Sequence, residues 1–577
     1  MQKKILLTLI FLCFASCSWA TDWYVRQNNG DYGNEDGTTY ADAWDGLMSV
    51  VWGGAGVIAG DTLYVCGTNI YPHTPHSSPY TKVDITVSGN DEDSRIIIRG
   101  DYPGDAGTIW GNYVIGGTYS EWTDEGDNVY STASSNTVYG YFYFENITGT
   151  WDLLTKANTL QDCRDTPGSY YSATYTYPNP VYFHCSDNGA PDLRVSSPMV
   201  GYHMYLTDRQ FITFLNIDFY SPYFAEMNGG YIRWEGCKLW YMSAGFLFAD
   251  NAHHMEIIDC DRAYGGGGIG FRDNVPYGNA PNNVTISGCK IHDIGIYVQN
   301  VDAEGIGANG LDDSIIEHNE FYNCGSAFTT YPYTNQSSEN VIIRWNYIHD
   351  THSIGGARDR GIEINMSGAN SMPRSGYQVY GNIVGPGVDG DGYRSTFDTY
   401  EVIFYNNIAY GCDYSFYFDY VYSAEKGPNI RLRNNISMNP KTLHIYFGSQ
   451  TTDANYVIDS DYNLFYPDGA AFFRLKDLGG QTNTDFAGWQ SLSKAGCTFD
   501  PNSILDDPNF ISPGGGVFNL NVASPAIDTG IDVGLTEDFI GTAVPQNTDF
   551  DIGAYEYIYG VSTQYLIANL FRRYEDE

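Results

Sequence analysis

Nine segments of this chain share one short pattern, in which apolar residues alternate with other residues and an Asn or Cys follows at a fixed place. Examples are IRWEGCKL, VTISGCKI, VIIRWNYI and IRLRNNIS. The residues at the fixed place are Cys237, Cys260, Cys289, Asn319, Asn346, Asn382, Asn407, Asn435 and Asn463. They span 226 residues from first to last, so the eight steps average about 28 residues. A repeat of this length predicts a solenoid in which each repeat forms one coil.

The residues inside each repeat indicate strands rather than helices. The runs are short, alternate with a period of two and are rich in Ile, Val, Phe and Tyr. Each coil would hold two or three strands, paired with their equivalents about 4.8 Å above and below. The asparagines would then form a hydrogen-bonded ladder along the axis. Because Cys is small enough for the same place, we expect Cys237, Cys260 and Cys289 to be packed thiols. The sequence predicts an all-β, parallel β-helix.

Segments at both ends of the array strengthen this prediction. WYVRQNNGDYGNEDGTTYADAWDGL with GDTLYVCGTNIY resembles the opening segment of bacterial secreted right-handed parallel β-helix proteins, and IIIRGDYPGDAG resembles their first full coil. Many polysaccharide lyases and some glycoside hydrolases have this architecture. The resemblance implies one right-handed β-helix domain over residues 21–557, with a short N-terminal capping helix around Trp44 to Val51. It also implies an insert at 150–200, a closing segment at 510–557 and a tail at 558–577.

The N-terminus predicts export. Residues 1–20 have the lysines, apolar run and small final residues of a secretory signal, with cleavage after Ala20. Lipidation at Cys17, within Phe-Ala-Ser-Cys, is the alternative. No later segment reaches the roughly 18 apolar residues of a membrane helix, so we expect no transmembrane segment. Cys163 and Cys185 lie in one non-repeating segment, and we expect a disulfide between them in an oxidising compartment.

The charge of the chain limits its partners. It has 29 Lys and Arg against 69 Asp and Glu, a net charge of −40. This balance argues against nucleic acid, since phosphate binding needs a basic surface. The resemblance instead implies a polysaccharide partner. A polyanionic polysaccharide would need a local basic cleft or bridging cations, and we expect the protein itself to be a monomer.

Charged and aromatic residues gather on one strand of each coil, directly after its longest loop. These strands include GIGFRD, GIGANG, GIEIN, GYRSTFD and SFYFDY, and alternation turns every second side chain outward. The outward residues are Arg272, Asn309, Tyr331, Glu363, Asn365, Arg394, Asp398, Tyr417, Asp419 and Tyr446. We expect Glu363, Arg394 and Tyr417 in one column, with Asn365 and Asp419 in the next. In the proteins that this chain resembles, the outer face of this sheet is the usual substrate groove.

Two chemistries fit these residues. A glycosidase needs two carboxyl groups about 5.5 Å apart for retention or about 6.5–9.5 Å apart for inversion, and Glu363 with Asp398 or Asp419 would supply them. A lyase needs a cation beside the uronate and a base for the α-proton. Arg360, Arg394 or a Ca²⁺ ion held by Asp residues would supply the cation. The base would be Tyr331, Tyr417 or His352.

The resulting hypothesis is a polysaccharide-cleaving protein. We assign as catalytic Glu363, Arg394, Asp398 and Asp419. We assign as substrate-binding Arg360, Tyr331, Asn365, Tyr417, Arg272 and Asn309. Ca²⁺ is the one cofactor considered, and no residue is assigned to hold it. The prevalence of lyases among the proteins that the chain resembles favours β-elimination, while hydrolysis and glycan binding without catalysis remain the alternatives.

Overall fold

The computed structural model describes residues 20–560 with internal gaps. The gaps are 71–82, 116–121, 134–143, 147–150, 173–179, 192–194, 199–203, 221–223, 243–245, 250, 272–279, 296–302, 332–336, 353–358, 367–373, 398–400, 421–428, 450–455 and 478–479. Four of the predictions above lie outside the described residues: the signal segment up to residue 19 with Cys17, the tail from residue 561, and the site residues Arg272 and Asp398.

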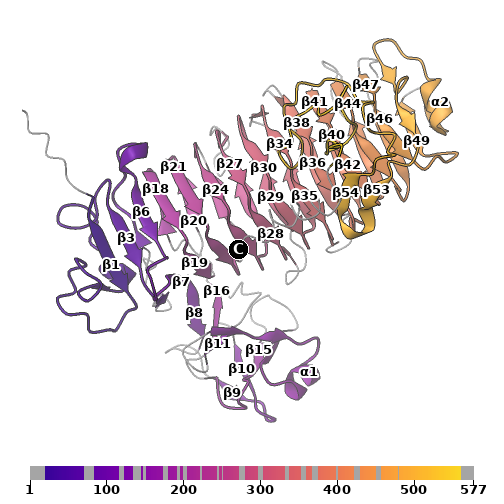
Figure 1. Ribbon diagram of the computed structural model, residues 1–577. Helices are drawn as coiled ribbons and strands as arrows, with labels where there is room; N and C mark the ends of the chain where they lie inside the picture. The colour runs from indigo at the N-terminus through magenta and orange to yellow at the C-terminus, as the bar shows by residue number, and fades with distance from the viewer. Residues whose placement is uncertain are drawn as a thin grey trace, which may run out of the picture.

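Three long sheets form the walls of a solenoid, which confirms the predicted parallel β-helix (Figure 1). Each coil passes through sheet 1, then a tight turn, sheet 2, a longer loop and sheet 3. All neighbouring strands along the solenoid are parallel except the final pair of sheet 3, β49 and β50. No helix among the described residues is long and apolar enough to cross a membrane.

The strands of the three sheets have the following bounds, in spatial order. Sheet 1 consists of β2 (Trp44–Asp45), β1 (Asp22–Arg26), β3 (Thr62–Val65), β6 (Ile96–Arg99), β18 (Gln210–Leu215), β21 (Gly230–Glu235), β24 (Glu256–Ile258), β27 (Thr285–Ser287), β30 (Ile315–Glu317), β34 (Ile342–Arg344), β38 (Tyr377–Tyr380), β41 (Glu401–Tyr405), β44 (Asn429–Arg433), β47 (Val457–Asp461) and β51 (Thr498–Phe499). Sheet 2 consists of β4 (Thr68–Ile70), β7 (Thr108–Trp110), β19 (Asp218–Tyr220), β22 (Lys238–Trp240), β25 (Asp261–Ala263), β28 (Lys290–His292), β31 (Glu320–Tyr322), β35 (Tyr347–His349), β39 (Ile383–Val384), β42 (Ile408–Tyr410), β45 (Ile436–Met438), β48 (Leu464–Tyr466) and β52 (Ile504–Leu505). Sheet 3 consists of β5 (Val83–Asp84), β17 (Met204–Tyr205), β20 (Phe224–Met227), β23 (Phe246–Ala249), β26 (Ile269–Phe271), β29 (Glu304–Ala308), β32 (Ser326–Thr330), β36 (Arg360–Met366), β40 (Asp391–Phe397), β43 (Tyr414–Tyr420), β46 (Leu443–Ser449), β49 (Phe473–Asp477) and β50 (Gly480–Thr484).

The repeated Asn or Cys lies in the tight turn between sheets 1 and 2. Asn319 Nδ2 donates to Asn346 Oδ1 at 3.0 Å, and Asn346 Nδ2 donates to Asn382 Oδ1 at 2.9 Å. The ladder extends to the cysteines, because the Cys237 backbone N–H donates to Cys260 Sγ at 3.4 Å. Burial raises the pKa of the Cys260 thiol. The predicted ladder and the packed thiols are therefore present.

Both ends of the solenoid are covered by aromatic residues. At the N-terminal end, Trp44 of β2 stacks on Trp23 at 5.2 Å, and the predicted short capping helix is a single 3₁₀ turn, η1 (Leu47–Ser49). A second 3₁₀ turn, η2 (Glu92–Ser94), precedes β6. At the other end, helix α2 (Phe486–Gln490) buries Trp489, whose indole N–H donates to Asp500 at 2.8 Å.

A separate lobe projects from the solenoid between β7 and β17 (Figure 1). It spans residues 112–198, which include most of the expected insert at 150–200. One of its sheets contains β9 (Thr123–Asp124), β10 (Val129–Ala133), β13 (Thr155–Lys156), β14 (Ser169–Ser172) and β15 (Pro180–His184). The other contains β8 (Asn112–Ile115), β11 (Phe144–Asn146), β12 (Trp151–Leu153) and β16 (Val195–Pro198).

The lobe contradicts the predicted disulfide. Cys163 lies on helix α1 (Leu160–Asp165). Cys163 and Cys185 are both buried, and they form no disulfide with each other. The Cys163 thiol instead donates to the backbone oxygens of Ser169 and Tyr182 at 3.8 and 3.9 Å. These contacts satisfy the thiol inside the lobe core.

The expected closing segment, residues 510–557, lies along the side of the solenoid rather than over its end, and we call it the strap (Figure 1). It begins with the antiparallel pair β53 (Phe510–Ser512) and β54 (Val517–Leu520), joined by the 3₁₀ turn η3 (Pro513–Gly515). Outside the three sheets, β33 (Ser338–Glu339) also pairs with β37 (Arg374–Ser375). The strap covers outward apolar residues of sheet 2, among them Ile383, Ile408 and Ile436.

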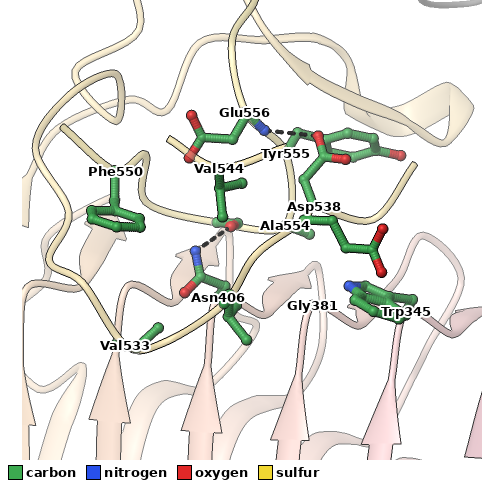
Figure 2. Close-up of a pocket in the computed structure, with 13 residues that line it drawn as sticks. Trp345, Gly381, Asn406, Val533, Asp538, Val544, Phe550, Ala554, Tyr555 and Glu556 are labelled. Atoms are coloured by element: carbon green, nitrogen blue, oxygen red, sulfur yellow. Dashed lines mark hydrogen bonds between the residues drawn. The ribbon is translucent and has the colours of Figure 1, made fainter. Parts of the chain in front are cut away.

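The strap is fixed to the solenoid by turn residues. Figure 2 shows the small cavity between the two, with Trp345 and Asn406 on the solenoid side and Asp538, Ala554 and Tyr555 on the strap side. Asn406 Nδ2 donates to the backbone oxygen of Gly553 at 2.9 Å. The strap therefore shields this part of sheet 2 and leaves the outer face of sheet 3 uncovered by it.

Candidate active site on sheet 3

The registers of sheet 3 reproduce the columns expected from the sequence. Glu363 on β36 pairs with Arg394 on β40, which pairs with Tyr417 on β43. In the next column, Asn365 is in register with Thr396, and Thr396 with Asp419. Adjacent parallel strands are about 4.8 Å apart, so residues of one column are close enough to contact one sugar unit.

Four charged residues on β36 and β40 form a square of alternating sign. Arg360 and Glu363 lie three residues apart on β36, and Asp391 and Arg394 occupy the registered positions of β40 with the charges reversed. Arg360 Nη1 donates to Glu363 Oε2. Arg394 Nε lies 3.0 Å from Glu363 Oε1, and Arg394 Nη1 lies 2.7 Å from Asp391 Oδ2. Glu363 is thus held between two guanidinium groups.

The two carboxylates of this square lie beneath the two arginines. Glu363 and Asp391 have 1% and 0% of their side chains exposed, whereas Arg360 and Arg394 have 22% and 19%. Burial raises the pKa of the Glu363 carboxyl, against the opposite effect of both arginines. Nε of each arginine is itself buried, so the exposed part of each side chain is the rest of the guanidinium group and its stem. The guanidinium groups therefore form the part of the square that a ligand would contact.

Tyr331 connects the preceding coil to the square. It follows β32. Its hydroxyl group donates a hydrogen bond to Glu363 Oε2 at 3.4 Å and accepts one from Arg360 Nη1 at 3.3 Å. Asn309 Nδ2 donates to the Tyr331 backbone oxygen at 3.0 Å and so helps to position it. The phenol is half-buried beside one carboxylate and one guanidinium group.

Aromatic rings continue the column beyond the square. The guanidinium carbon of Arg394 lies 4.5 Å from the centre of the Tyr417 ring, which stacks on Tyr446 at 4.6 Å. Tyr417 donates to Asp419 Oδ2 at 3.2 Å. Burial, with the nearby Asp419 carboxylate, raises the pKa of Tyr417, so this phenol is a poor base.

The structure brings together Glu363, Arg394, Arg360, Tyr331 and Tyr417, with Asp419 bonded to the last. The prediction that Glu363, Asn365 and Tyr446 face solvent is wrong, because contacts with adjacent coils bury all three residues. Asn365 instead bonds through its backbone to the Thr330 hydroxyl.

Asp391 is the residue of this cluster that the sequence reasoning did not assign. A signal for it was present, since Arg-x-x-Glu at 360–363 and Asp-x-x-Arg at 391–394 follow similar loops on successive coils.

Close approach of β36 and β40 also requires glycine between the charged residues. A Cβ on Gly361 would lie 2.4 Å from the Gly392 backbone oxygen.

The arrangement does not fit calcium. Among the residues that the structure describes, no group of three or more His, Cys, Asp or Glu side chains is placed to hold a metal ion. Glu363 and Asp391 face arginines. We therefore derive no step through Ca²⁺.

His352, the third candidate base, lies outside the square. Neither ring nitrogen of His352 has a hydrogen-bond partner among the described residues, and burial lowers its pKa.

Comparisons with known proteins agree with the architecture. Residues 225–397 match the family model described as "Right handed beta helix region". No curated protein matches the chain. The solved structure of XylC with xylose is 12% identical with a TM-score of 0.54, covering 93% of this chain and 98% of that chain. Pectate lyase Pel9A is 11% identical with a TM-score of 0.41, covering 94% and 97%. A rhamnogalacturonan lyase is 10% identical with a TM-score of 0.38, covering 95% and 98%. The family match and the XylC likeness, with the sheets described above, identify the fold as a right-handed parallel β-helix.

Proposed function

We propose that this chain is a polysaccharide lyase that binds a uronic-acid-containing polysaccharide on the outer face of sheet 3 and cleaves it by β-elimination. One observation carries the proposal. Arg360 and Arg394 share the buried Glu363 carboxylate, and 22% and 19% of their own side chains are exposed. Arginine suits a carboxylate ligand because its planar N–H groups match the two oxygens. A uronate therefore fits this pair better than a neutral sugar does.

In the proposed reaction, the arginines bind the uronate carboxylate and stabilise the negative charge that develops when the α-proton leaves. Tyr331 passes its phenolic proton to Glu363, and the phenolate removes the α-proton. The electron pair of that C–H bond forms a carbon–carbon double bond as the bond to the glycosidic oxygen breaks. Tyr331 then protonates the leaving oxygen, and Glu363 returns the first proton to Tyr331.

Hydrolysis is the other reaction that the sequence left open. It needs two carboxyl groups that both reach the sugar. Glu363 is 1% exposed and paired with two arginines, and Asp419 accepts a hydrogen bond from Tyr417. These contacts favour Glu363 as a residue that positions the arginines and accepts a proton, which supports elimination over hydrolysis.

The test is incubation of the purified protein with a panel of uronic-acid-containing and neutral polysaccharides. Reducing ends are measured together with the ultraviolet absorbance of an unsaturated uronate. We expect both signals to rise on at least one acidic polysaccharide, in buffer with a chelator as well as with Ca²⁺. Reducing ends without absorbance would mean hydrolysis, and binding without products would mean a glycan-binding protein.

Two variants identify the site of the reaction. Arg394→Ala should lower kcat/KM about 100-fold or more, the size of effect seen when one group that stabilises developing charge is removed. Arg431→Ala is the matched control, because Arg431 is an exposed arginine on sheet 1. Equal activity of the two variants would place the reaction elsewhere.

We also propose that the lyase is exported by the segment 1–20 and acts as a monomer. The support is the signal-like sequence and the acidic composition. Mass spectrometry of the N-terminus distinguishes cleavage after Ala20 from lipidation at Cys17. Size-exclusion chromatography with light scattering tests the monomer.

A further inference from the structure

An open cavity of about 390 Å³ lies on the outer face of sheet 1. Its floor contains Arg233, Glu256 and Thr285, which are consecutive outward residues of β21, β24 and β27. Its rim lies where the chain enters sheet 1, with Tyr231 at the start of β21 and His254 just before β24 among the lining residues. The cavity shares no residue with the site on sheet 3.

Two of the rim residues have a backbone conformation that is unusual for rings. Tyr231 and His254 have φ values of 58° and 52°, in the left-handed region. The same place in later coils holds Asn283, Asp313 and Asn340, with φ values of 53°, 47° and 55°. Asn and Asp tolerate this region, whereas a bulky side chain there is strained. The two aromatic residues thus occupy a place where the repeat itself would favour asparagine.

The strained rings form a row that stops at the cavity. Phe211, also left-handed at φ 54°, stacks on Tyr231 at 4.5 Å, and Tyr231 stacks on His254 at 4.4 Å. The next residue of the column is the exposed Asn283, which has no ring. One face of the His254 imidazole therefore borders the cavity instead of another ring.

Buried contacts hold this row in place. Arg95, 8% exposed, donates through Nη1 to the Tyr231 backbone oxygen at 2.7 Å and is itself bound by Glu92. The His253 and His254 Nδ1 atoms lie 2.9 Å apart, so one imidazole donates to the other. These contacts fix the position of the His254 ring at the edge of the cavity.

The charges around the cavity select the class of ligand. Arg95 and Arg233 face Glu92, Glu256 and Asp313, so these five residues carry an excess of one negative charge. Arg95 is fully engaged, and Arg233 Nε donates to Glu256 Oε2 at 2.7 Å. An anionic ligand is therefore disfavoured. A planar Arg–Glu pair beside a ring face suits a ligand with many hydroxyl groups and one apolar face.

We propose that this cavity is a second saccharide-binding site, specific for neutral sugars. The sugar ring packs on the open face of His254, and its hydroxyl groups bond to Arg233 and Glu256. The site would hold the protein on a neutral polysaccharide that it does not cleave. It is independent of the lyase reaction, because a neutral sugar lacks the carboxylate that the sheet 3 arginines need.

The test is retention of the full-length protein on an array of neutral gluco-, xylo-, manno- and galacto-oligosaccharides. His254→Asn is the main variant, since asparagine suits the left-handed turn and the fold should be kept. We expect it to weaken binding at least tenfold, and Arg233→Ala to do the same. His318→Asn is the matched control, because His318 is also left-handed, at φ 56°, and lies outside the cavity.

Binding of a neutral glycan that is lost in His254→Asn and Arg233→Ala but kept in His318→Asn supports the proposal. It is overturned if no neutral glycan is retained, or if both site variants bind as the wild type does. Thermal unfolding of each variant separates loss of binding from loss of fold. Lyase activity of His254→Asn should equal that of the wild type, so failure here leaves the function proposed for sheet 3 untouched.

Discussion

Nδ2 of Asn407 donates to Oδ1 of Asn435 at 3.0 Å, and the same oxygen accepts the Asn407 backbone N–H at 3.0 Å. The arrangement repeats on the next coil, where Asn463 Oδ1 accepts both N–H groups from Asn435. These side chains are buried, so each amide satisfies backbone groups that no water could reach. The ladder is therefore what allows the tight turn between sheets 1 and 2 to be buried.

Replacing one member should weaken the solenoid. Asn407→Ala removes the acceptor for both N–H groups of Asn382, and we expect the free energy of unfolding to fall by about 2–3 kcal/mol. Asn407→Cys should cost less, because upstream coils hold cysteine at this place. Urea unfolding measures both, with the exposed amide variant Gln378→Ala as the control. A loss no larger than that of the control would contradict a stabilising role for the ladder.

The strap depends on one asparagine in particular. Asn434 Nδ2 donates to the Ile531 backbone oxygen at 2.7 Å, and its Oδ1 accepts the Ile531 N–H at 2.9 Å. Asn434→Gly keeps the left-handed backbone but loses both bonds, so the Ile531 amide should exchange hydrogen at least about tenfold faster. Asn439→Gly is the control, since Asn439 is left-handed and exposed. Unchanged exchange at Ile531 would mean that apolar packing alone holds the strap.

The architecture was predictable because its determinants repeat. The period of about 28 residues, the alternation in each strand and the Asn or Cys turn all specify the same stacked coil. The columns through Glu363 and Arg394 followed from alignment of these repeats. The lobe and the course of the strap do not repeat, so no register could be predicted for them. The outward Ile408 and Ile436, unusual on an exposed face, were the available signal that something covers sheet 2.

The sequence predicted which residues form the site, but it did not predict how deeply their side chains are buried. Alternation places Glu363 on the outer side of sheet 3. It does not reveal that long arginine side chains from the same and the next coil fold over that carboxylate. Asp391 was missed because strict alternation places residues three apart on one strand on opposite faces, so it does not predict the contact between Asp391 and Arg394 on β40.

The charged square predicts a ranking of variants. Glu363→Gln leaves both arginines without their shared carboxylate and removes the proton acceptor of Tyr331, so kcat should fall about 100-fold or more. Asp391→Asn removes the carboxylate that Arg394 Nη1 contacts but leaves Glu363 between the two arginines, so it should cost less. Steady-state kinetics on the substrate found by the panel measure both, with circular dichroism to verify the fold. A larger loss in Asp391→Asn would contradict the central place of Glu363.

The strap should make stability depend on pH. Burial raises the pKa of Asp551 to about 7 and that of Asp538 to about 6, above the ordinary value of 3.8. A raised carboxyl pKa means that the folded state binds the proton more tightly than the unfolded state does. Ionisation of these two carboxyl groups therefore destabilises the folded state. It lowers the free energy of unfolding progressively as the pH rises from about 4 to about 7.

Asp551→Asn isolates that contribution. The amide cannot ionise, so the difference in melting temperature between wild type and variant should shrink or reverse as pH rises from about 5 to about 8. One of the two backbone N–H groups, from Asp528 or Tyr557, loses its acceptor, so the variant should be less stable than the wild type at low pH. Asp549→Asn is the control, because Asp549 is exposed two residues away. A pH-independent difference for Asp551→Asn would show that this carboxyl has the same pKa in the folded and unfolded chain.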